Sequence, residues 1–86
     1  MKATLDVLKV FITQSCRGCK RALELAAWVR KIKPKLVVEV VDLSLPSNAD
    51  HVRVFAVPAY VYGDRTVFLG NPSHEELGAW LARLEA

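Results

Sequence analysis

The chain has 86 residues, 52% of them hydrophobic, and its 12 Lys and Arg outnumber its 9 Asp and Glu, which leaves a formal net charge of +3. This length accommodates one domain, residues 1–86, and this apolar fraction predicts a packed core rather than a disordered chain. No apolar run approaches the roughly 20 residues of a membrane helix, and the basic residues fit the solvated side of a helix rather than a nucleic-acid-binding face. We therefore expect neither a membrane nor a nucleic acid as a partner.

The first predicted strand runs from about Leu5 to Ile12, and a predicted helix follows from Arg17 to Lys33. Apolar residues recur along this helix at intervals of three and four, which predicts one buried stripe. The stripe consists of Cys19, Ala22, Leu25, Ala26, Val29 and Ile32. Pro34 ends the helix, because its ring removes a backbone donor and disfavours helical geometry at the preceding residue.

The segment Leu36–Val41 is rich in valine and nearly continuous in apolar residues, which is typical of a central strand covered on both faces. A strand, a helix and a strand joined by short connections imply a right-handed parallel crossover. A short helix is predicted next, capped by Ser47 and extending to about Phe55, with Asp50 in its first turn.

Two β-prone segments, Ala59–Tyr62 and Thr66–Leu69, flank a Gly-Asp turn, which predicts an antiparallel hairpin. A final helix is predicted after Ser73, which forms a capping box with Glu76 three residues later. The apolar stripe of this helix consists of Leu77, Trp80, Leu81 and Leu84. The predicted order is therefore βαβαββα, an α/β fold.

The only two cysteines of the sequence, Cys16 and Cys19, lie at the junction between the first strand and the first helix. Only a thiolate is nucleophilic, and a helix N-terminus stabilises one through its aligned peptide dipoles and free N–H groups. A cysteine in such a Cys-x-x-Cys motif commonly has a pKa lowered from about 8.5 to roughly 3.5–7.5. Cys19 is placed to attack a mixed disulfide on Cys16, so the pair has the arrangement of a redox couple. Arg17 and Lys20 add positive potential at Cys16.

With these elements in this order, the chain resembles the thioredoxin-fold thiol–disulfide oxidoreductases, and its small size and single leading strand resemble the glutaredoxin-like branch. The resemblance rests on the Cys-x-x-Cys motif, on Val57-Pro58 before the third strand, on the hairpin, and on Gly70 before the last helix. It implies a thioredoxin fold with a four-stranded mixed sheet flanked by helices. It also implies that Cys16 attacks the substrate disulfide and that Cys19 resolves the intermediate. Pro58 would be a cis-proline facing the disulfide, and the Val57 backbone would bind a substrate segment.

The sequence departs from both branches of that family. Thioredoxins have Gly-Pro between the cysteines and a buried aspartate on the preceding strand, where this chain has Arg17-Gly18 and Val10. Glutaredoxins have Pro-Tyr between the cysteines and a Gly-Gly pair near the last helix, where this chain has Gly70-Asn71. The glutathione site is only partly represented, which favours dithiol exchange over monothiol glutathione chemistry.

We expect an enzyme whose redox-active group is the Cys16–Cys19 disulfide, with no further cofactor and no bound metal. Protein disulfides are the expected substrates, and glutathione or a reductase is the expected source of electrons. We also expect a monomer. The N-terminal residues contain no apolar segment followed by a cleavage site, which favours a cytoplasmic location, where a close cysteine pair is more often catalytic or metal-binding than structural.

Two other interpretations stay open. Copper carriers also place a Cys-x-x-Cys motif at a first strand–helix junction, because two thiolates suit Cu(I), but their order is βαββαβ and Val57-Pro58 has no role in them. A thioredoxin-fold interaction module would keep the fold, while its cysteines would turn over poorly because the buried acid is absent. His51 and His74 do not have the spacing that would complete a zinc site with the two cysteines.

Overall fold

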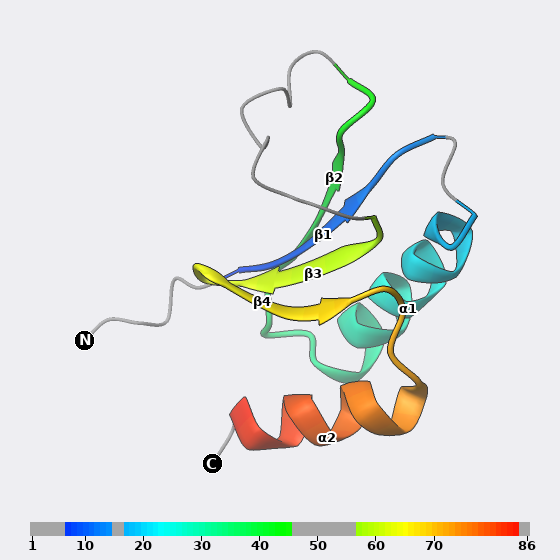
Figure 1. The fold of residues 1–86 in the computed structure, drawn as a ribbon. Coiled ribbons are helices and arrows are strands. Elements are labelled where there is room, and N and C mark those ends of the chain that lie inside the picture. The colour runs from blue at the N-terminus through cyan, green and yellow to red at the C-terminus, as the bar shows by residue number, and fades with distance from the viewer. Residues whose placement is uncertain (1–6, 15–16, 46–56, 85–86) are drawn as a thin grey trace.

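The computed structural model describes residues 7–14, 17–45 and 57–84 and combines a sheet with helices (Figure 1). In chain order the elements are β1 (Leu8–Ile12), α1 (Cys19–Ile32), β2 (Val38–Asp42), β3 (Ala59–Tyr62), β4 (Arg65–Leu69) and α2 (His74–Leu84). Each of them corresponds to an element predicted from the sequence. The predicted helix from Ser47 to Phe55 lies outside the described residues.

The described strands form one mixed sheet in the order β2-β1-β3-β4. β1 and β2 are parallel and are connected through α1, which confirms the predicted parallel crossover. β3 runs antiparallel to both β1 and β4, which confirms the predicted hairpin. Gly63 lies in the turn of this hairpin with a φ of 64°, a left-handed conformation that favours glycine. The four-stranded mixed sheet that the resemblance implies is therefore present within the described residues.

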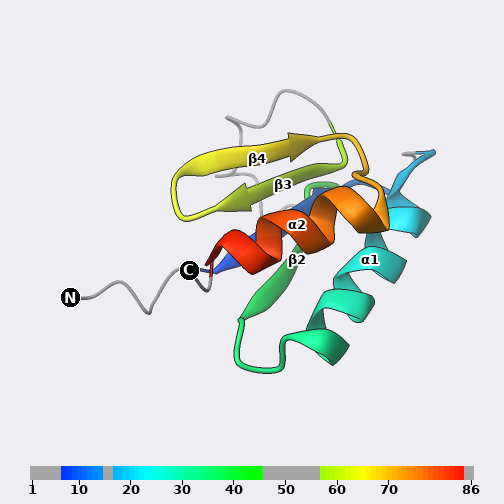
Figure 2. The ribbon, with the colours of Figure 1, turned by 90° about the horizontal axis from the view of Figure 1, so that it is seen from below.

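Both described helices pack on the same face of the sheet (Figure 2). Leu8, Val10 and Ile12 of β1 point toward them, because alternate residues of a strand face the same side. The buried residues of this main core are Leu8, Val10, Ile12, Cys19, Ala22, Leu25, Ala26, Val29, Val38, Tyr60, Leu77 and Leu81. Removal of this apolar surface from water is the dominant favourable contribution to folding.

A smaller apolar cluster lies on the opposite face of the sheet. Its buried residues Phe11, Val41 and Ala59 come from three adjacent strands. Val57, which precedes β3, packs against both this cluster and the main core. β1 is therefore covered on both sides, since Val10 is completely buried on one face and Phe11 is only 4% exposed on the other.

The position of β2 differs from the prediction. The sequence predicts a central strand over Leu36–Val41, but β2 begins at Val38 and lies at an edge of the described sheet. Both of its faces do carry buried valines, since Val38 belongs to the main core and Val41 to the opposite cluster. An apolar run reports burial of the two faces, whereas the place of a strand in the sheet depends on its pairing partners. Within the described residues, β2 pairs with β1 alone.

α1 begins at Cys19, later than predicted, with Gly18 as its N-cap and Lys33 as its C-cap. The predicted stripe is buried from Cys19 to Val29, but its last member, Ile32, is 41% exposed. Ile32 instead lines an open groove of about 510 Å³ together with residues of the α1–β2 turn, β3 and α2. The last turn of α1 therefore extends past the core.

α2 begins with the predicted capping box. The Glu76 backbone N–H donates to Ser73 Oγ at 3.0 Å, and the Ser73 N–H donates to Glu76 Oε1 at 2.9 Å. Leu77 and Leu81 are buried against the sheet, while Leu84 is 38% exposed. Neither of the described helices is long and apolar enough to cross a membrane.

Arg30 covers part of the outer edge of β2. Its guanidinium donates to the Val38 carbonyl at 2.7 Å, on the side of the strand that faces away from β1. That carbonyl faces outward because carbonyls alternate along a strand and the preceding one, of Val37, accepts from Leu8 of β1 at 3.0 Å. At the far end of β2, the Asp42 carbonyl accepts from the Leu45 N–H at 3.1 Å. Both ends of this edge are thus closed by the chain itself.

Replacing Arg30 with alanine should lower the free energy of unfolding by about 1 kcal/mol, because the Val38 carbonyl loses a charged hydrogen-bond donor. It should also increase self-association, since an uncovered strand edge is a template for pairing with another chain. Urea denaturation and sedimentation velocity measure these two effects. Arg83→Ala, which removes an exposed arginine from the last turn of α2, is the matched control. Equal stability and equal sedimentation of the two variants would contradict the role given to Arg30.

Candidate active site

The cysteine motif lies where the chain leaves β1 and enters α1. Cys19 is the first residue of α1, is only 4% exposed, and is disulfide-bonded. The prediction that Cys19 is largely covered is therefore confirmed. Cys16, the predicted attacking cysteine, lies outside the described residues.

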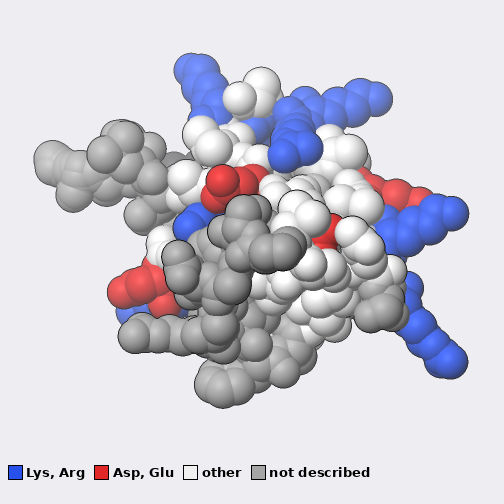
Figure 3. Space-filling view, turned by 90° about the horizontal axis from the view of Figure 1, so that it is seen from above, with Lys and Arg blue, Asp and Glu red and all other residues white. Residues whose placement is uncertain are grey.

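The start of α1 is electrostatically favourable for a thiolate. Its first turn contains no acidic residue, and the predicted tuning residues Arg17 and Lys20 are both exposed there. Figure 3 shows that Lys and Arg side chains project outward from the described surface and that Asp and Glu lie between them. Positive charge and the N-terminal end of the helix dipole therefore act in the same direction. The influence of Arg17 and Lys20 on Cys16 stays a prediction.

Pro58, the residue before β3, packs against the motif. The Val57–Pro58 peptide bond is cis, as the resemblance implies, and Pro58 is buried. A Cβ atom placed on Gly18 would lie 3.3 Å from Pro58 Cδ, so the proline ring and the motif backbone are in close contact. The Pro58 carbonyl accepts from the Gly70 N–H at 2.8 Å, which joins it to the segment before α2. The predicted pairing of Val57 with substrate stays a prediction.

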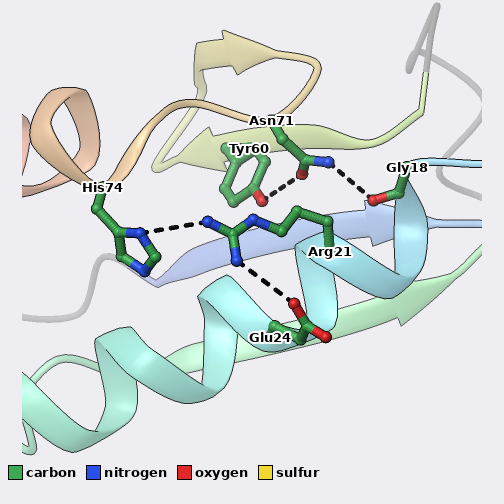
Figure 4. Close-up of polar contacts among 6 residues, drawn as sticks. All are labelled: Gly18, Arg21, Glu24, Tyr60, Asn71 and His74. Carbon is green, nitrogen blue, oxygen red and sulfur yellow. Dashed lines mark hydrogen bonds and ion pairs between the residues drawn. The ribbon is translucent and has the colours of Figure 1, made fainter.

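Asn71 connects this segment to the motif (Figure 4). Its Nδ2 donates to the Gly18 carbonyl at 2.8 Å, and its Oδ1 accepts from the Tyr60 hydroxyl at 2.8 Å. The same Gly18 carbonyl accepts the Ala22 N–H at 3.0 Å, the first backbone hydrogen bond of α1. One backbone oxygen between the two cysteine positions thus receives both a helix bond and a side-chain bond from another part of the chain.

Tyr60 is the buried end of this connection, with 1% of its surface exposed. Burial raises its pKa from 10.0 to about 12, an effect that the positive charge of Arg21 partly opposes. Tyr60 is therefore protonated at neutral pH and donates its hydroxyl hydrogen. Because a carbonyl only accepts, Asn71 must turn its NH₂ group toward Gly18 and its oxygen toward Tyr60.

Arg21 lies beside this network and links the two helices (Figure 4). Its guanidinium contacts Glu24 Oε1 at 3.4 Å and His74 Nδ1 at 3.2 Å. Since an arginine only donates, His74 Nδ1 accepts here. The His74 ring also meets Trp28 edge-on, with centroids 4.7 Å apart. Arg21 and His74 are both exposed, yet the structure pairs them.

A family model described as a thioredoxin domain matches residues 7–82, which is most of the chain. The chain belongs to the thioredoxin-domain family. Its expected identity as a thioredoxin-fold protein of the thiol–disulfide oxidoreductase type is thereby confirmed. No curated protein sequence is a significant match.

Solved thioredoxin structures share the fold. Trichomonas vaginalis thioredoxin superposes with a TM-score of 0.72 at 22% identity, covering 92% of this chain and 78% of that chain. Fasciola hepatica thioredoxin gives 0.71 at 22% identity, with 91% and 79% covered. Arabidopsis thaliana thioredoxin O2 in its oxidised state gives 0.69 at 20% identity, with 94% and 76% covered. The predicted likeness to the glutaredoxin branch stays a prediction.

This thioredoxin domain has an apolar residue at the position that the resemblance assigns to a buried aspartate. Val10 is completely buried in β1, where it pairs with Val40 on one side and Tyr60 on the other. No charged side chain is buried in the part of the chain that the structure describes. Of the two residues paired with Val10, only Tyr60 carries a polar group, and its phenol is neutral.

Other places in the described domain contribute little to the site. The open groove is lined by residues at the C-terminal end of α1, and the 14 residues of the helix separate it from the motif by about 20 Å. Within residues 7–14, 17–45 and 57–84, no three His, Cys, Asp or Glu side chains are grouped so that they could hold a metal ion.

Sequence reasoning missed the role of Asn71. It reads as one of several turn residues between the hairpin and α2, and the N-cap of that helix is supplied by Ser73. Because Ser73 already caps α2, the polar side chain of Asn71 has no capping role there, and this is a signal in the sequence for a more distant partner. Its partners Gly18 and Tyr60 are 53 and 11 residues away in the sequence, so local pattern does not identify them.

The buried hydroxyl can be tested by titration. An ultraviolet titration of the folded protein should show a tyrosine that ionises near pH 12, and Tyr60→Phe should lack that step. Because burial raises the pKa of Tyr60 above 10.0, the folded state holds more protons than the unfolded state between pH 10 and 12. The stability that Tyr60 contributes is therefore complete below pH 10.0 and falls toward pH 12. Tyr62→Phe should keep the late step; its disappearance there instead would place the buried hydroxyl on the wrong residue.

Proposed function

We propose that this protein is a dithiol–disulfide oxidoreductase in which Cys16 attacks a substrate disulfide and Cys19 resolves the intermediate. The observation that carries the proposal is the position of Cys19, which is buried and disulfide-bonded at the first residue of α1. Membership of the thioredoxin-domain family supports the same chemistry. The close contact of the motif with Pro58 supports it further, because a substrate segment laid along that proline would meet the cysteines.

The reaction balances as two thiol–disulfide exchanges. The Cys16 thiolate attacks one sulfur of the substrate disulfide; a Cys16–substrate bond forms, the substrate S–S bond breaks, and the leaving sulfur departs with the electron pair and takes a proton. Cys19 then loses its proton and attacks the Cys16 sulfur. The Cys16–Cys19 bond forms and the second substrate thiol is released. The substrate gains two electrons and two protons, and the protein becomes oxidised.

The neighbouring residues have separate parts in this proposal. The N-terminal end of α1, with Arg17 and Lys20, stabilises the Cys16 thiolate. The Val57 backbone pairs with an extended substrate segment, and Pro58 supports that segment next to the motif. These are roles of binding and charge stabilisation, while both bond-forming steps belong to the cysteines.

The oxidised protein needs a thiol reductant to begin another cycle. We propose glutathione or a thiol reductase as that reductant and protein disulfides as substrates. The proposal places the protein in the cytoplasm, where reducing conditions regenerate dithiols, and treats the monomer as the active form. No metal takes part in either exchange step.

The alternatives are distinguished by fold and by turnover. The described elements run β1, α1, β2, β3, β4, α2, which departs from the βαββαβ order of copper carriers, and the family match disfavours that function. An interaction module with poor turnover would share the fold. Val10 favours slow resolution, because it supplies no group that could accept the Cys19 proton.

Replacing each cysteine with serine separates the two steps. Cys19→Ser should still attack a substrate disulfide but should accumulate the mixed disulfide, because the resolving sulfur is gone. Cys16→Ser should lose the reaction altogether. Insulin reduction measures turnover, and mass spectrometry identifies the trapped adduct on Cys16.

Full turnover of Cys19→Ser with glutathione would contradict the dithiol route and support monothiol chemistry. A wild-type chain that binds Cu(I) tightly through both thiols and shows no exchange would support the metal carrier. A wild-type chain that forms its disulfide yet reduces insulin no faster than Cys16→Ser would support the interaction module.

A further inference from the structure

We infer that Asn71 is a positioning residue for the cysteine motif: it holds the Gly18 carbonyl of the oxidised chain, and residue 18 is glycine because Asn71 and Pro58 occupy the space a side chain would need. The inference deepens the proposed function and rests on it for its effect on redox balance.

Asn71 is hydrogen-bonded to the backbone of the motif. Asn71 Nδ2 donates to the Gly18 carbonyl at 2.8 Å, and that carbonyl lies in the short stretch that joins the two cysteine positions. The carbonyl also accepts the Ala22 N–H at 3.0 Å, so it marks the beginning of α1. Gly18 makes no side-chain capping bond of its own. Asn71 therefore adds, from outside the helix, a second hydrogen bond to the carbonyl at which the first turn begins.

Two partners orient the Asn71 amide, Tyr60 and Gly18. Tyr60 donates to Asn71 Oδ1 at 2.8 Å, and Tyr60 is itself fixed by burial in the main core. The Gly18 carbonyl can only accept, so it takes the NH₂ group of Asn71, and the amide oxygen is left to accept the hydrogen of the protonated Tyr60 phenol. Arg21 is the charged group that acts on Tyr60, and it leaves the phenol neutral. The Asn71 amide is thus held by a buried residue, while the Gly70 N–H bond to the Pro58 carbonyl holds its own segment.

The surroundings of Gly18, and not its backbone conformation, restrict the residue at position 18. Its φ of −86° is one that any L-residue adopts, so backbone conformation does not require glycine here. A Cβ atom would instead lie 3.1 Å from Asn71 Nδ2 and 3.3 Å from Pro58 Cδ, closer than ordinary contacts. Close approach favours glycine, since Asn71 or Pro58 would have to shift to admit a Cβ. It also explains why this motif has neither the proline nor the tyrosine that related families place between their cysteines.

The Asn71–Gly18 hydrogen bond affects the equilibrium between the disulfide and dithiol forms. The contacts of Gly18 are those of a chain in which Cys19 is disulfide-bonded. A disulfide restrains the short stretch between the cysteines, and a restrained carbonyl loses little freedom when it accepts a hydrogen bond. Reduction releases that stretch, so the Asn71 bond is formed less often in the dithiol form. Asn71 therefore stabilises the oxidised form more than the reduced form.

The experiment compares Asn71→Ala, Tyr60→Phe and the control Tyr62→Phe. Tyr62 lies on the same face of β3 and meets Trp80 edge-on, but no hydrogen bond of its hydroxyl is present among the described residues. The equilibrium of the cysteine couple against dithiothreitol should shift toward the dithiol by up to roughly tenfold in Asn71→Ala, the factor that corresponds to one net hydrogen bond made in the oxidised form and fully lost in the dithiol form. Tyr60→Phe should shift it in the same direction by less, and Tyr62→Phe should leave it unchanged.

Unfolding of the oxidised and reduced chains gives a reading that does not depend on enzymatic turnover. Asn71→Ala should destabilise the oxidised chain more than the reduced chain, by the same factor as the redox shift, because the two measurements close one thermodynamic cycle. Equal destabilisation of both forms would overturn the positioning role even if the wild type reduces insulin. A wild type without insulin reduction would overturn the proposed function, while unequal destabilisation would still support Asn71.

A double-mutant cycle tests the account of Gly18. Gly18→Ala should be destabilising in the wild type and less so when Asn71 is already alanine, because the nearest obstructing atom is then absent. Additive effects of the two substitutions would show that Asn71 does not determine the residue at position 18.

Discussion

The antiparallel register between β1 and β3 is the constraint on which the site depends. Phe11 of β1 pairs with Ala59 of β3, so Pro58, one residue earlier, lies beside the end of β1. The chain leaves β1 at that same end and turns into α1. A slip of this register by one residue would turn the apolar side chains of β3 to the wrong faces, because side chains alternate along a strand. Packing of the core on both faces therefore holds the proline next to the cysteine motif.

The same register places Tyr60 opposite Val10, in the middle of the sheet. A carboxylate at either position would have to be buried in an apolar core, which is costly without a charged partner. A phenol is easier to bury, since it needs one acceptor, and Asn71 provides it at 2.8 Å. The polar group in this part of the core thus serves to fix geometry, because it is held in its neutral form and does not exchange protons near neutral pH.

The features that sequence predicts here are those set by neighbours along the chain. The capping box of Ser73 and Glu76 and the buried stripe from Cys19 to Val29 follow from spacing alone, and both are observed. The family resemblance added the cis peptide bond at Pro58, which is also present. The features that sequence did not predict depend on distant partners. The edge position of β2 follows from pairing, and the contacts of Gly18 with Asn71 and of Arg21 with His74 each join residues 53 apart.

The residues between the cysteines are consequently not an independent module. In this chain Gly18 faces Asn71 and Pro58, so the size of residue 18 is coupled to the segment before α2. A Gly-Pro or Pro-Tyr pair transferred from a relative would place a Cβ atom 3.1 Å from the Asn71 amide nitrogen and would crowd its hydrogen bond to the motif. The contacts of the motif therefore depend on two parts of the chain together: the residues between the cysteines set which contacts fit, and the segment before α2 sets which contacts are made.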